Sequence, residues 1–519
     1  MISLDLSTLA TAMNGQLICH ESMMSTQVKN LVTDSRALKL EEELKEKLPE
    51  NSTTKEQDVF LALKGPNFDG HRFIQQVIEK GCQVLIVDHR ITDIDNNKVA
   101  QIIVDDTRIA LGQIAAYVKQ QVAPKTVGIT GSSGKTTVKE MLAAILSRLG
   151  KVLATNGNFN NDIGVPLTLL RLEQDHDFAV IEMGANHIGE IAYTTELVKP
   201  DVAMINNIAA AHLEGFGDLC GVARAKGEIF SGLSTDGIAL YNKDTKYTSK
   251  WQWRLTDKQV RTFSCAISRY TDAPVNADCY SENVTLDENG CASFDLQSSL
   301  GLCVIKLTVP GKHNVCNAVA AATAAIECGA SLNDIQLGLT QMAPVKGRLN
   351  IHHLNETQVS SEIRLIDDTY NANVESIKAA IALLASYSGQ RILVLGDMAE
   401  LGSEARSYHQ EVGEYAKEQG IDVLLTLGVL SQNTSDAFAQ KNEATSEHFN
   451  DKNMLEEYLF NLLMKEGSKP QKNQILIKGS RSAHMEYVVE NIINWHAKKQ
   501  KESQLLSKNK LSTNKQDNS

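Results

Sequence analysis

The chain of 519 residues lacks the long apolar run that a membrane-spanning helix requires. No apolar stretch reaches about 18 residues, so no segment is expected to cross a membrane. The opening residues, MISLDLSTLATAMNG, include an early acidic residue and no basic stretch, unlike a signal peptide. We therefore expect a cytoplasmic protein.

The sequence also lacks the cysteine spacing of a metal site and an excess of basic residues. The nine cysteines form no CxxC pair, and without an export signal we expect them to be reduced thiols. A net charge of −12 argues against nucleic acid as a main partner, because nucleic acids usually require a basic face. At this length, roughly three folded domains are expected.

Strand-like and helical segments alternate in two regions of the chain. TVGITG, DFAVIEMG, PDVAMINNI and GIALYN form the first series, and IRLIDD, RILVLGDM, DVLLTLG and QILIKGS form the second. Such alternation predicts an α/β fold with parallel sheets covered on both faces. We expect a small α/β N-terminal domain (1–107), a central parallel-sheet domain (108–345), a Rossmann-like C-terminal domain (346–496) and a disordered polar tail (497–519).

The segment GITGSSGKTT, residues 128–137, is typical of a phosphate-binding loop. It lies between a predicted strand and a helix with apolar residues at Val138, Met141, Leu142, Ile145 and Leu149. Glycines let backbone amides face phosphate oxygens, and the helix N-terminus favours negative charge. Ile129 stands where the strict P-loop spacing has glycine, but the flanking elements still indicate an ATP-using enzyme. The candidate loop residues are Thr130, Gly131, Ser132, Ser133, Gly134, Lys135, Thr136 and Thr137, of which Lys135 can reach the β and γ phosphates and Thr136 can bind Mg²⁺.

Three further residues follow the loop in the same region. Glu182 ends a predicted strand, where a carboxylate beside a phosphate loop suits Mg²⁺, while His212 and Lys226 lie in INNIAAAHLEGFG and ARAKGEIF. Taken singly, each has a plain alternative: a solvated strand-end glutamate, a structural histidine and a surface lysine. Only their order along the chain makes them a set.

In this order, TGSSGKTT, EMGANHIGE, NNIAAAHLEGFG and AKGEIF resemble the central ATPase domain of the Mur ligases. These cell-wall enzymes add amino acids or peptides to UDP-N-acetylmuramic acid. TNGNFNNDIGVPLTLL, GKHNVCNAVAA, KGRL, DDTYNANVES, LGDMAELG and KGSRSAHME look like the members that add D-alanyl-D-alanine, and TDSR and DVFLALKGPNFDGHRFI fit their UDP-sugar-binding domain. The DNPR motif of the diaminopimelate-adding members does not occur. Val374 replaces the proline of the usual YNANP motif.

The resemblance implies an ATP-dependent ligase. A UDP-N-acetylmuramoyl-tripeptide carboxylate would attack the γ-phosphorus of ATP, and the amine of D-alanyl-D-alanine would then displace phosphate from the acyl phosphate, giving a UDP-MurNAc-pentapeptide for peptidoglycan synthesis. By the same resemblance, Lys135 would hold the triphosphate, Thr136 and Glu182 one Mg²⁺, and His212 with a carbamylated (N6-carboxylated) Lys226 a second Mg²⁺.

The resemblance also implies the remaining binding residues and the partners. Asn314, Asn317, Arg348 and Asp368 would contact the nucleotide, Asn160, Asn161 and Asn371 the peptide substrate, and Ser35, Arg36 and Lys64 the UDP end. We expect a monomer that binds small-molecule substrates and no nucleic acid. Because these residues are spread over three domains, closure about a hinge near 345–349 is expected.

Two other classes of function stay open. One is a different ligase on this fold, such as a diaminopimelate-adding Mur ligase or folylpolyglutamate synthase; the DGH region and the TYNAN motif argue against the latter. The other is a P-loop protein without catalysis. The joint presence of Glu182, His212 and Lys226 argues against it.

Overall fold

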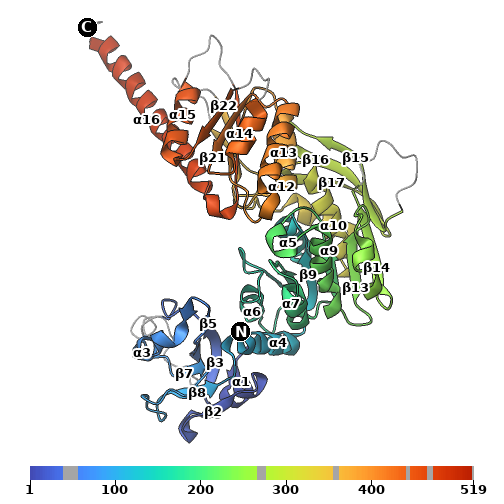
Figure 1. The fold of residues 1–519 in the computed structure, drawn as a ribbon, viewed down its shortest axis with the longest axis vertical. Coiled ribbons are helices and arrows are strands. Elements are labelled where there is room, and N and C mark those ends of the chain that lie inside the picture. Colours follow the sequence, from blue (N-terminus) through green and yellow to red (C-terminus); the bar gives the residue numbers. More distant parts are fainter. Residues whose placement is uncertain (39–55, 266–275, 355–361, 440–444, 465–471, 517–519) are drawn as a thin grey trace.

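The computed structural model describes residues 1–38, 56–265, 276–354, 362–439, 445–464 and 472–516, with side chains to residue 505. Three large sheets follow one another along the chain (Figure 1). Each sheet lies within one of the three stretches predicted as domains. Among the described helices, none combines the length and apolar character needed to cross a membrane.

The N-terminal sheet has the strand order β1-β3-β4-β7-β8-β2. Its inner strands β3, β4, β7 and β8 are parallel, while β1 and β2 pair antiparallel at the edges. All four residues of β7 are buried, as expected of an apolar strand covered on both faces. The elements are β1 (Leu4–Asp5), α1 (Leu6–Ala12), β2 (Gln16–Ile18), β3 (Gln27–Val32), β4 (Glu56–Leu61), β5 (Lys64–Gly65), β6 (Phe68–Asp69), α3 (Ile74–Glu79), β7 (Val84–Val87) and β8 (Ala100–Ile103), with short 3₁₀ turns η1 (Glu21–Met23) and η2 (Gly70–Phe73).

Helix α4 (Thr107–Val122) leads from this domain to the next. Asp106 caps it by accepting the backbone amides of Arg108 and Ile109. The helix packs against α1 on one side and against α6 (Gly164–Leu169) and α7 (Glu190–Val198) on the other. Arg108 also forms an ion pair with Asp162 of the central domain.

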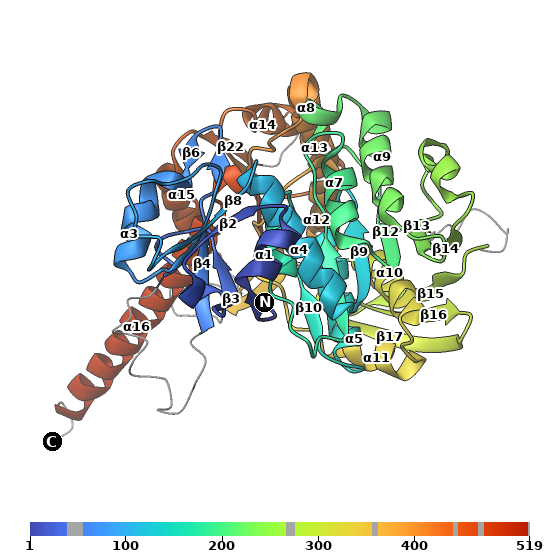
Figure 2. The ribbon, with the colours of Figure 1, turned by 90° about the horizontal axis from the view of Figure 1, so that it is seen from below.

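The central sheet has nine strands in the order β10-β11-β9-β12-β13-β14-β15-β16-β17. In β11 and β12, alternate residues enter two different apolar clusters, so the sheet has a core on each face. Helices α5, α10 and α11 pack together on one face, and α7 lies on the other (Figure 2). The strands are β9 (Lys125–Thr130), β10 (Val152–Ala154), β11 (Phe178–Glu182), β12 (Val202–Ile205), β13 (Ile238–Asn242), β14 (Gln259–Ser264), β15 (Cys279–Leu286), β16 (Cys291–Ser298) and β17 (Gly301–Pro310).

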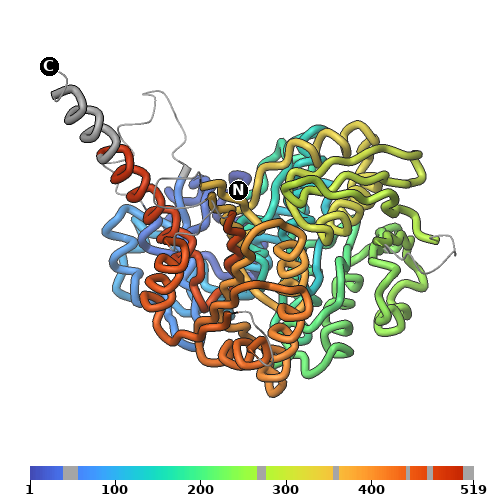
Figure 3. The backbone as a smooth tube through the Cα atoms, turned by 90° about the horizontal axis from the view of Figure 1, so that it is seen from above, coloured from blue at the N-terminus to red at the C-terminus, as the bar shows by residue number. Residues whose placement is uncertain are grey.

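Two features of this domain differ from the sequence expectation. Strands β15 to β17 form an antiparallel extension at the edge of the sheet, remote from the N-terminal domain (Figures 1 and 3). Leu149 lies beyond the end of α5 and is partly exposed, so it is not part of the buried helical face. The helices are α5 (Lys135–Leu146), α6, α7, α8 (Leu213–Phe216), α9 (Leu219–Gly227), α10 (His313–Glu327) and α11 (Leu332–Thr340), with 3₁₀ turns η3 (Glu228–Gly232), η4 (Thr248–Lys250) and η5 (Gln252–Leu255).

A disulfide joins Cys265, just after β14, to Cys316 on α10. The expectation that all cysteines are reduced is therefore wrong for this pair. The two residues are 51 positions apart and meet only because α10 packs against β14. No short sequence spacing could have indicated the bond.

The third sheet has the order β18-β19-β23-β20-β21-β22. It is parallel except for β18, which pairs antiparallel with β19, and neither β18 nor β22 was anticipated from the sequence. The elements are β18 (Asn350–Leu354), β19 (Ile363–Asp368), α12 (Val374–Ala385), β20 (Gln390–Gly396), η6 (Gly402–Glu404), α13 (Ala405–Glu418), β21 (Val423–Leu427), α14 (Gln432–Ala439), β22 (Thr445–Phe449), α15 (Lys452–Met464), β23 (Asn473–Lys478), η7 (Arg481–Ala483) and α16 (Glu486–Gln516).

The prediction of a disordered tail from residue 497 is wrong for the residues that the structure describes. Helix α16 continues to Gln516, so residues 497–516 are helical, and only 517–519 lie outside the described residues. Val488 and Ile492 bury the start of this helix in the third domain. From that anchored start, a segment rich in Lys, Gln and Leu and free of Gly and Pro can continue the helix, because none of its residues breaks a helix.

Candidate active site

The predicted phosphate-binding loop connects β9 to α5. Gly131 and Gly134 have φ angles of 156° and 74°, which residues with a β-carbon rarely adopt. At Gly134 a β-carbon would also lie 2.4 Å from Oδ1 of Asn317. The turn therefore requires glycine at this point, and it leads into the N-terminus of α5, where an anion is favoured.

Lys135 is the first residue of α5, and its side chain folds back over the loop. Its Nζ atom donates to the carbonyl oxygen of Gly131 at 2.8 Å. Desolvation lowers the pKa of Lys135, and the nearby Glu182 partly opposes this shift. A phosphate group bound in the loop would give the Lys135 ammonium group a negatively charged partner.

Thr136 and Glu182, predicted to share a metal ion, are in direct contact. The Thr136 hydroxyl donates to Oε2 of Glu182 at 3.0 Å, and the amide of Asn160 donates to Oε1 at 2.8 Å. Glu182 is buried at the end of β11, next to β9 in the sheet. A buried carboxylate beside a hydroxyl is a set of hard oxygen ligands, which fits Mg²⁺.

His212 is the N-cap of the short helix α8 and has a left-handed backbone, with φ of 53°. Its Nδ1 atom lies 2.6 Å from Oε2 of Glu400, which belongs to the third domain. This contact with His212 lowers the pKa of the Glu400 carboxyl. The sequence singled out His212 but not its partner.

Lys226 lies fully buried on α9, and its Nζ atom has no hydrogen-bond partner among the described residues. Desolvation, followed by repulsion from Lys135, lowers its pKa to about 7. Glu228, the partner it would have in an ordinary ion pair, instead accepts the amides of Gly189 and Ala192 at the start of α7. An unpartnered buried amine of this kind is unusual and calls for a ligand or a modification.

Asn314 and Asn317, predicted to contact the nucleotide, are buried on α10 and belong to a chain of hydrogen-bonded amides. Asn317 donates to Oδ1 of Asn314 at 2.8 Å and accepts from Asn206 at 3.0 Å. Asn206 also donates to the carbonyl oxygen of Ser133 in the loop. These bonds fix α10 against the phosphate-binding loop.

The third domain contributes Arg348 and Asp368 to the site. Arg348 stacks on the ring of Tyr370 at 4.3 Å, and its Nη2 atom lies 3.4 Å from Oγ1 of Thr136. Asp368 is buried and pairs with Lys478, whose Nζ atom lies 2.6 Å from Oδ2. The structure therefore brings both predicted residues next to the nucleotide loop.

The remaining asparagines occupy loops around the same space. Oδ1 of Asn161 accepts the amide of Gly164, and Oδ1 of Asn371 accepts the amide of Ala372. Asn373 caps α12, which places Val374 at the first helical position. Proline is favoured there because that amide needs no helical partner, so valine can replace it without losing a hydrogen bond.

These side chains surround one cavity of about 1220 Å³. Pockets for single small ligands are usually about 300–1,000 Å³, so this cavity has room for a nucleotide and part of a second substrate. Thr130, Gly131 and Lys226 lie behind its surface rather than on it. The predicted residues that line it are Ser132, Ser133, Gly134, Lys135, Thr136, Thr137, Asn160, Asn161, Glu182, His212, Asn314, Asn317, Arg348, Asp368 and Asn371.

Ser35, Arg36 and Lys64, predicted for the UDP end, lie in the N-terminal domain and do not line this cavity. Arg36 is exposed and pairs with Asp34 at 2.7 Å. Ser35 is buried, and its carbonyl oxygen accepts from Lys80 at 2.6 Å. The structure thus separates these three residues from the nucleotide loop.

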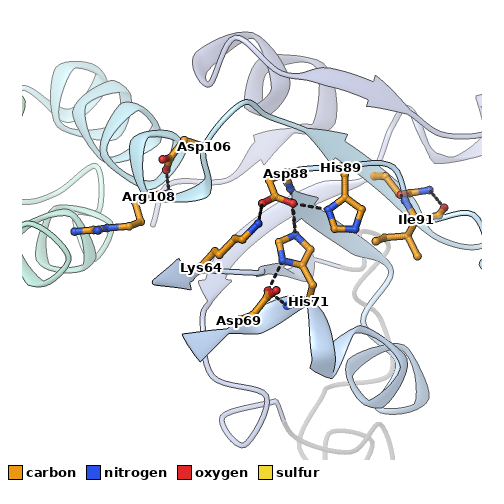
Figure 4. A network of polar contacts seen from close by, with 9 residues as sticks. Lys64, Asp69, His71, Asp88, His89, Ile91, Asp106 and Arg108 are labelled. Atoms are coloured by element: carbon orange, nitrogen blue, oxygen red, sulfur yellow. Dashed lines mark hydrogen bonds and ion pairs between the residues drawn. The ribbon is translucent and has the colours of Figure 1, made fainter. Parts of the chain in front are cut away.

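Lys64 belongs to a polar network that the sequence did not anticipate (Figure 4). Its Nζ atom donates to Asp88 at 3.1 Å, and the backbone amide of Asp88 donates to Nε2 of His71. Nδ1 of His71 lies 2.7 Å from Asp69, and His89 stacks on the His71 ring. With both ring nitrogens engaged, His71 holds the DGH turn against the end of β7.

The residues that sequence reasoning missed are Asn206, Glu400 and Lys478. All three stand inside motifs that the sequence analysis quoted, but an asparagine, a glutamate or a lysine in a loop carries no distinguishing signal of its own. Their roles depend on contacts with residues far away in the chain, such as Asn317, His212 and Asp368 respectively.

Three stretches of the chain match families of known proteins. Residues 129–325 match the Mur ligase middle domain, residues 347–481 the Mur ligase glutamate ligase domain, and residues 52–119 the Mur ligase family catalytic domain. The UDP-N-acetylmuramoyl-tripeptide–D-alanyl-D-alanine ligase of Escherichia coli is 45% identical over 489 residues, which cover 94% of this chain and 98% of that protein. The chain belongs to the Mur ligase family.

Solved structures of Mur ligases superpose on most of this chain. A crystal structure of MurF from Acinetobacter baumannii covers 95% of it, and 99% of that chain, with a TM-score of 0.82 and 36% identity. The MurF ligase from Thermotoga maritima, determined in complex with ADP, covers 91% and 98% with a TM-score of 0.74 and 25% identity. The predicted three-domain α/β fold of a Mur ligase is confirmed.

Proposed function

We propose that this Mur ligase uses ATP to join D-alanyl-D-alanine to UDP-N-acetylmuramoyl-tripeptide. The products are UDP-MurNAc-pentapeptide, ADP and phosphate, and the reaction belongs to peptidoglycan precursor synthesis. The observation that supports this most strongly is the nearly full-length match to ligases named for this reaction. In this protein, residues of the central and third domains line one large cavity around the phosphate-binding loop.

In the first step, the terminal carboxylate of the tripeptide attacks the γ-phosphorus of ATP, and the bond to the β–γ bridging oxygen breaks. An acyl phosphate and ADP result. Phosphoryl transfer requires mainly positioning and charge neutralisation. Lys135 and the amides of 131–136 would hold the triphosphate, and Arg348, stacked on Tyr370, would place a fixed positive charge beside it.

In the second step, the free amine of D-alanyl-D-alanine attacks the acyl carbon and phosphate leaves. The amine loses a proton as the amide forms, and the departing phosphate takes the electron pair. Asn160, which donates to Glu182, lines the cavity together with Asn161 and Asn371, and the three would hold the peptide ends in place. Asn314 and Asn317 would lie toward the base of the nucleotide.

Two Mg²⁺ ions fit the residues present. Thr136 and Glu182 offer hard oxygen ligands in direct contact, and His212 with Lys226 would hold the second ion. When bound, the ions neutralise phosphate charge. The protein's own part is to keep these ligands buried and oriented.

Lys226 can serve as a metal ligand only if it loses its positive charge. Its buried, unpartnered amine, with a pKa lowered to about 7, exists partly in the neutral form at physiological pH. The neutral amine adds to CO₂ and releases one proton, which gives a carbamate with two oxygen ligands. We propose this carbamylated lysine because Glu228, its alternative partner, is already bonded to the start of α7.

The proposed domain bounds follow the three sheets: an N-terminal domain (1–107) for the UDP end, a central ATP-binding domain (108–345) and a C-terminal domain (346–496). Ser35, Arg36 and Lys64 would bind the UDP end. We further propose that the protein is a monomer. We also propose that it is cytoplasmic, because the ATP and the nucleotide-linked substrate that it uses are made inside the cell.

A phosphate-release assay tests the proposal. The purified protein is given ATP, UDP-MurNAc-tripeptide and D-alanyl-D-alanine, each omitted in turn, with the third residue of the tripeptide either lysine or diaminopimelate. We expect release only with all three substrates, and a pentapeptide product by mass. Equal turnover with a single amino acid in place of the dipeptide, or with folate and glutamate, would refute it.

A further inference from the structure

One contact between the central and third domains involves a carboxylate that the reaction above does not use. Glu400 lies between β20 and η6, and its Oε2 atom lies 2.6 Å from Nδ1 of His212. Both residues line the cavity of the active site. The contact therefore joins a side chain of the third domain to a proposed metal ligand of the central domain.

The backbone on each side of this contact has an unusual conformation. His212 and Glu400 have φ angles of 53° and 62°, a left-handed region that residues with a β-carbon rarely occupy. Such conformations persist where the surroundings hold them, and they gather at functional sites. Here the amide of Glu214 donates to the carbonyl oxygen of Glu400 at 3.4 Å, and the neighbouring Leu213 and Leu401 are buried.

The two ring nitrogens of His212 have different surroundings, so one can contact Glu400 while the other binds a metal ion. Oε2 of Glu400 lies next to Nδ1, which leaves Nε2 as the nitrogen that can bind a metal ion. A carboxylate bonded to the second nitrogen of a ligating histidine fixes the tautomer and orientation of the ring and strengthens it as a ligand. Glu400 is placed to do this, and it comes from a different domain.

We propose that Glu400 is a positioning residue that orients His212 for metal binding, so that the second metal site is complete only when the third domain is docked. The inference rests on the proposed function, because it requires His212 to be a metal ligand. It adds a link between domain docking and the metal site. Phosphoryl transfer would then be disfavoured whenever the third domain was not docked against the central domain.

Metal binding tests this without relying on turnover. Mn²⁺ is titrated into the protein with adenosine 5′-(β,γ-imido)triphosphate, and free Mn²⁺ is measured by electron paramagnetic resonance. Loss of such a supporting carboxylate typically weakens metal binding ~10–100-fold. We expect Glu400→Gln to weaken one of two Mn²⁺ sites by about tenfold or more. Glu404→Gln, which removes an exposed charge from the same loop region, should change neither site by more than about twofold.

A second background shows whether Glu400 acts through His212. In His212→Ala, the weakened site should not respond further to Glu400→Gln, because the ring that the carboxylate orients is gone. Wild-type Mn²⁺ affinity in Glu400→Gln would overturn the inference. So would an equal effect in both backgrounds, which would mean that Glu400 affects metal binding independently of the His212 ring.

The ligase assay separates this inference from the proposed function. If the wild-type protein makes the pentapeptide and binds two Mn²⁺ ions, but Glu400→Gln binds both normally, only the role of Glu400 fails. If the wild-type protein binds no second Mn²⁺ ion, the inference fails together with the proposed metal site. If no pentapeptide forms at all, the proposed function fails first.

Discussion

The third and N-terminal domains meet the central domain in different ways. The third domain reaches the phosphate-binding loop directly, since Arg348 lies 3.4 Å from Thr136 and Asn373 donates to the carbonyl oxygen of Ser132. The N-terminal domain is joined through α4 and stands apart from the third domain (Figure 1). The predicted nucleotide residues of the central and third domains thus lie together, whereas the residues predicted for the UDP end do not line the same cavity.

This difference predicts which domain moves when the substrates bind. Closure about 345–349 was expected, and this segment does contain left-handed residues at Gly347 and Leu349. Because the third domain is already in contact with the loop, however, we predict that the larger movement belongs to the N-terminal domain.

The largest expected effect concerns Lys226, on helix α9 of the central domain. Lys226→Ala should lower kcat by at least ~10²-fold, the scale seen when one group that stabilises transition-state charge is removed. Acetate or propionate in the assay should restore part of the activity by standing in for the carbamate. Arg224→Ala, an exposed change on the same helix, is the control and should retain normal turnover. A nearly active Lys226→Ala would exclude the carbamate.

The next effect contrasts an ion pair of the third domain with one of the N-terminal domain. Lys478 is buried against Asp368, so Lys478→Met should cost about 3–5 kcal/mol by leaving a buried carboxylate without its partner. Lys64 pairs with Asp88 but is 58% exposed, so water screens the pair and Lys64→Met should destabilise the protein far less. Urea unfolding of both variants measures this, and similar losses would contradict the difference in burial.

Ligand-induced closure should be moderate and should depend on which ligand is present. In small-angle X-ray scattering, an ATP analogue alone should leave the radius of gyration nearly unchanged, because the third domain is already docked. Adding UDP-MurNAc-tripeptide should reduce it as the N-terminal domain approaches. Compaction by the nucleotide alone would reverse the comparison between the two domains.

Two truncations of α16 should have the smallest effects and should differ from each other. Deletion after Gln504 removes an exposed Leu505 and the residues that follow, so the melting temperature should change by less than about 1–2 °C. Deletion after Trp495 also removes the buried His496, so a larger fall is expected. Differential scanning calorimetry would detect it, and equal melting temperatures would show that His496 contributes nothing to stability.

Much of the fold could be predicted from the sequence because the parallel strands are short, apolar and followed by helices. β9, β11, β12, β19 and β23 all stand where such segments were found. Strands β15 to β17 could not be predicted in this way, since their alternating polar residues pair antiparallel at a sheet edge. The helical tail was missed for a different reason: its polar composition indicates disorder, and only anchoring through Val488 and Ile492 makes it a continuation of a helix.

The candidate site was predictable where one motif carries its own geometry. The phosphate-binding loop is such a case, because Gly131 and Gly134 are required by the local backbone. Lys478 and Glu400 were not predictable, since their significance arises from Asp368 and His212, which lie far away in the chain. The disulfide between Cys265 and Cys316 escaped prediction for the same reason.

The measurement that tests the proposed chemistry most directly follows one oxygen atom. UDP-MurNAc-tripeptide labelled with ¹⁸O in its terminal carboxylate is incubated with ATP, D-alanyl-D-alanine and the wild-type enzyme. If the carboxylate attacks the γ-phosphorus, the released phosphate must carry one ¹⁸O, and ADP must be the nucleotide product. Unlabelled phosphate, or the appearance of AMP, would contradict the acyl-phosphate route and with it the roles assigned to Lys135, Glu182 and Lys226.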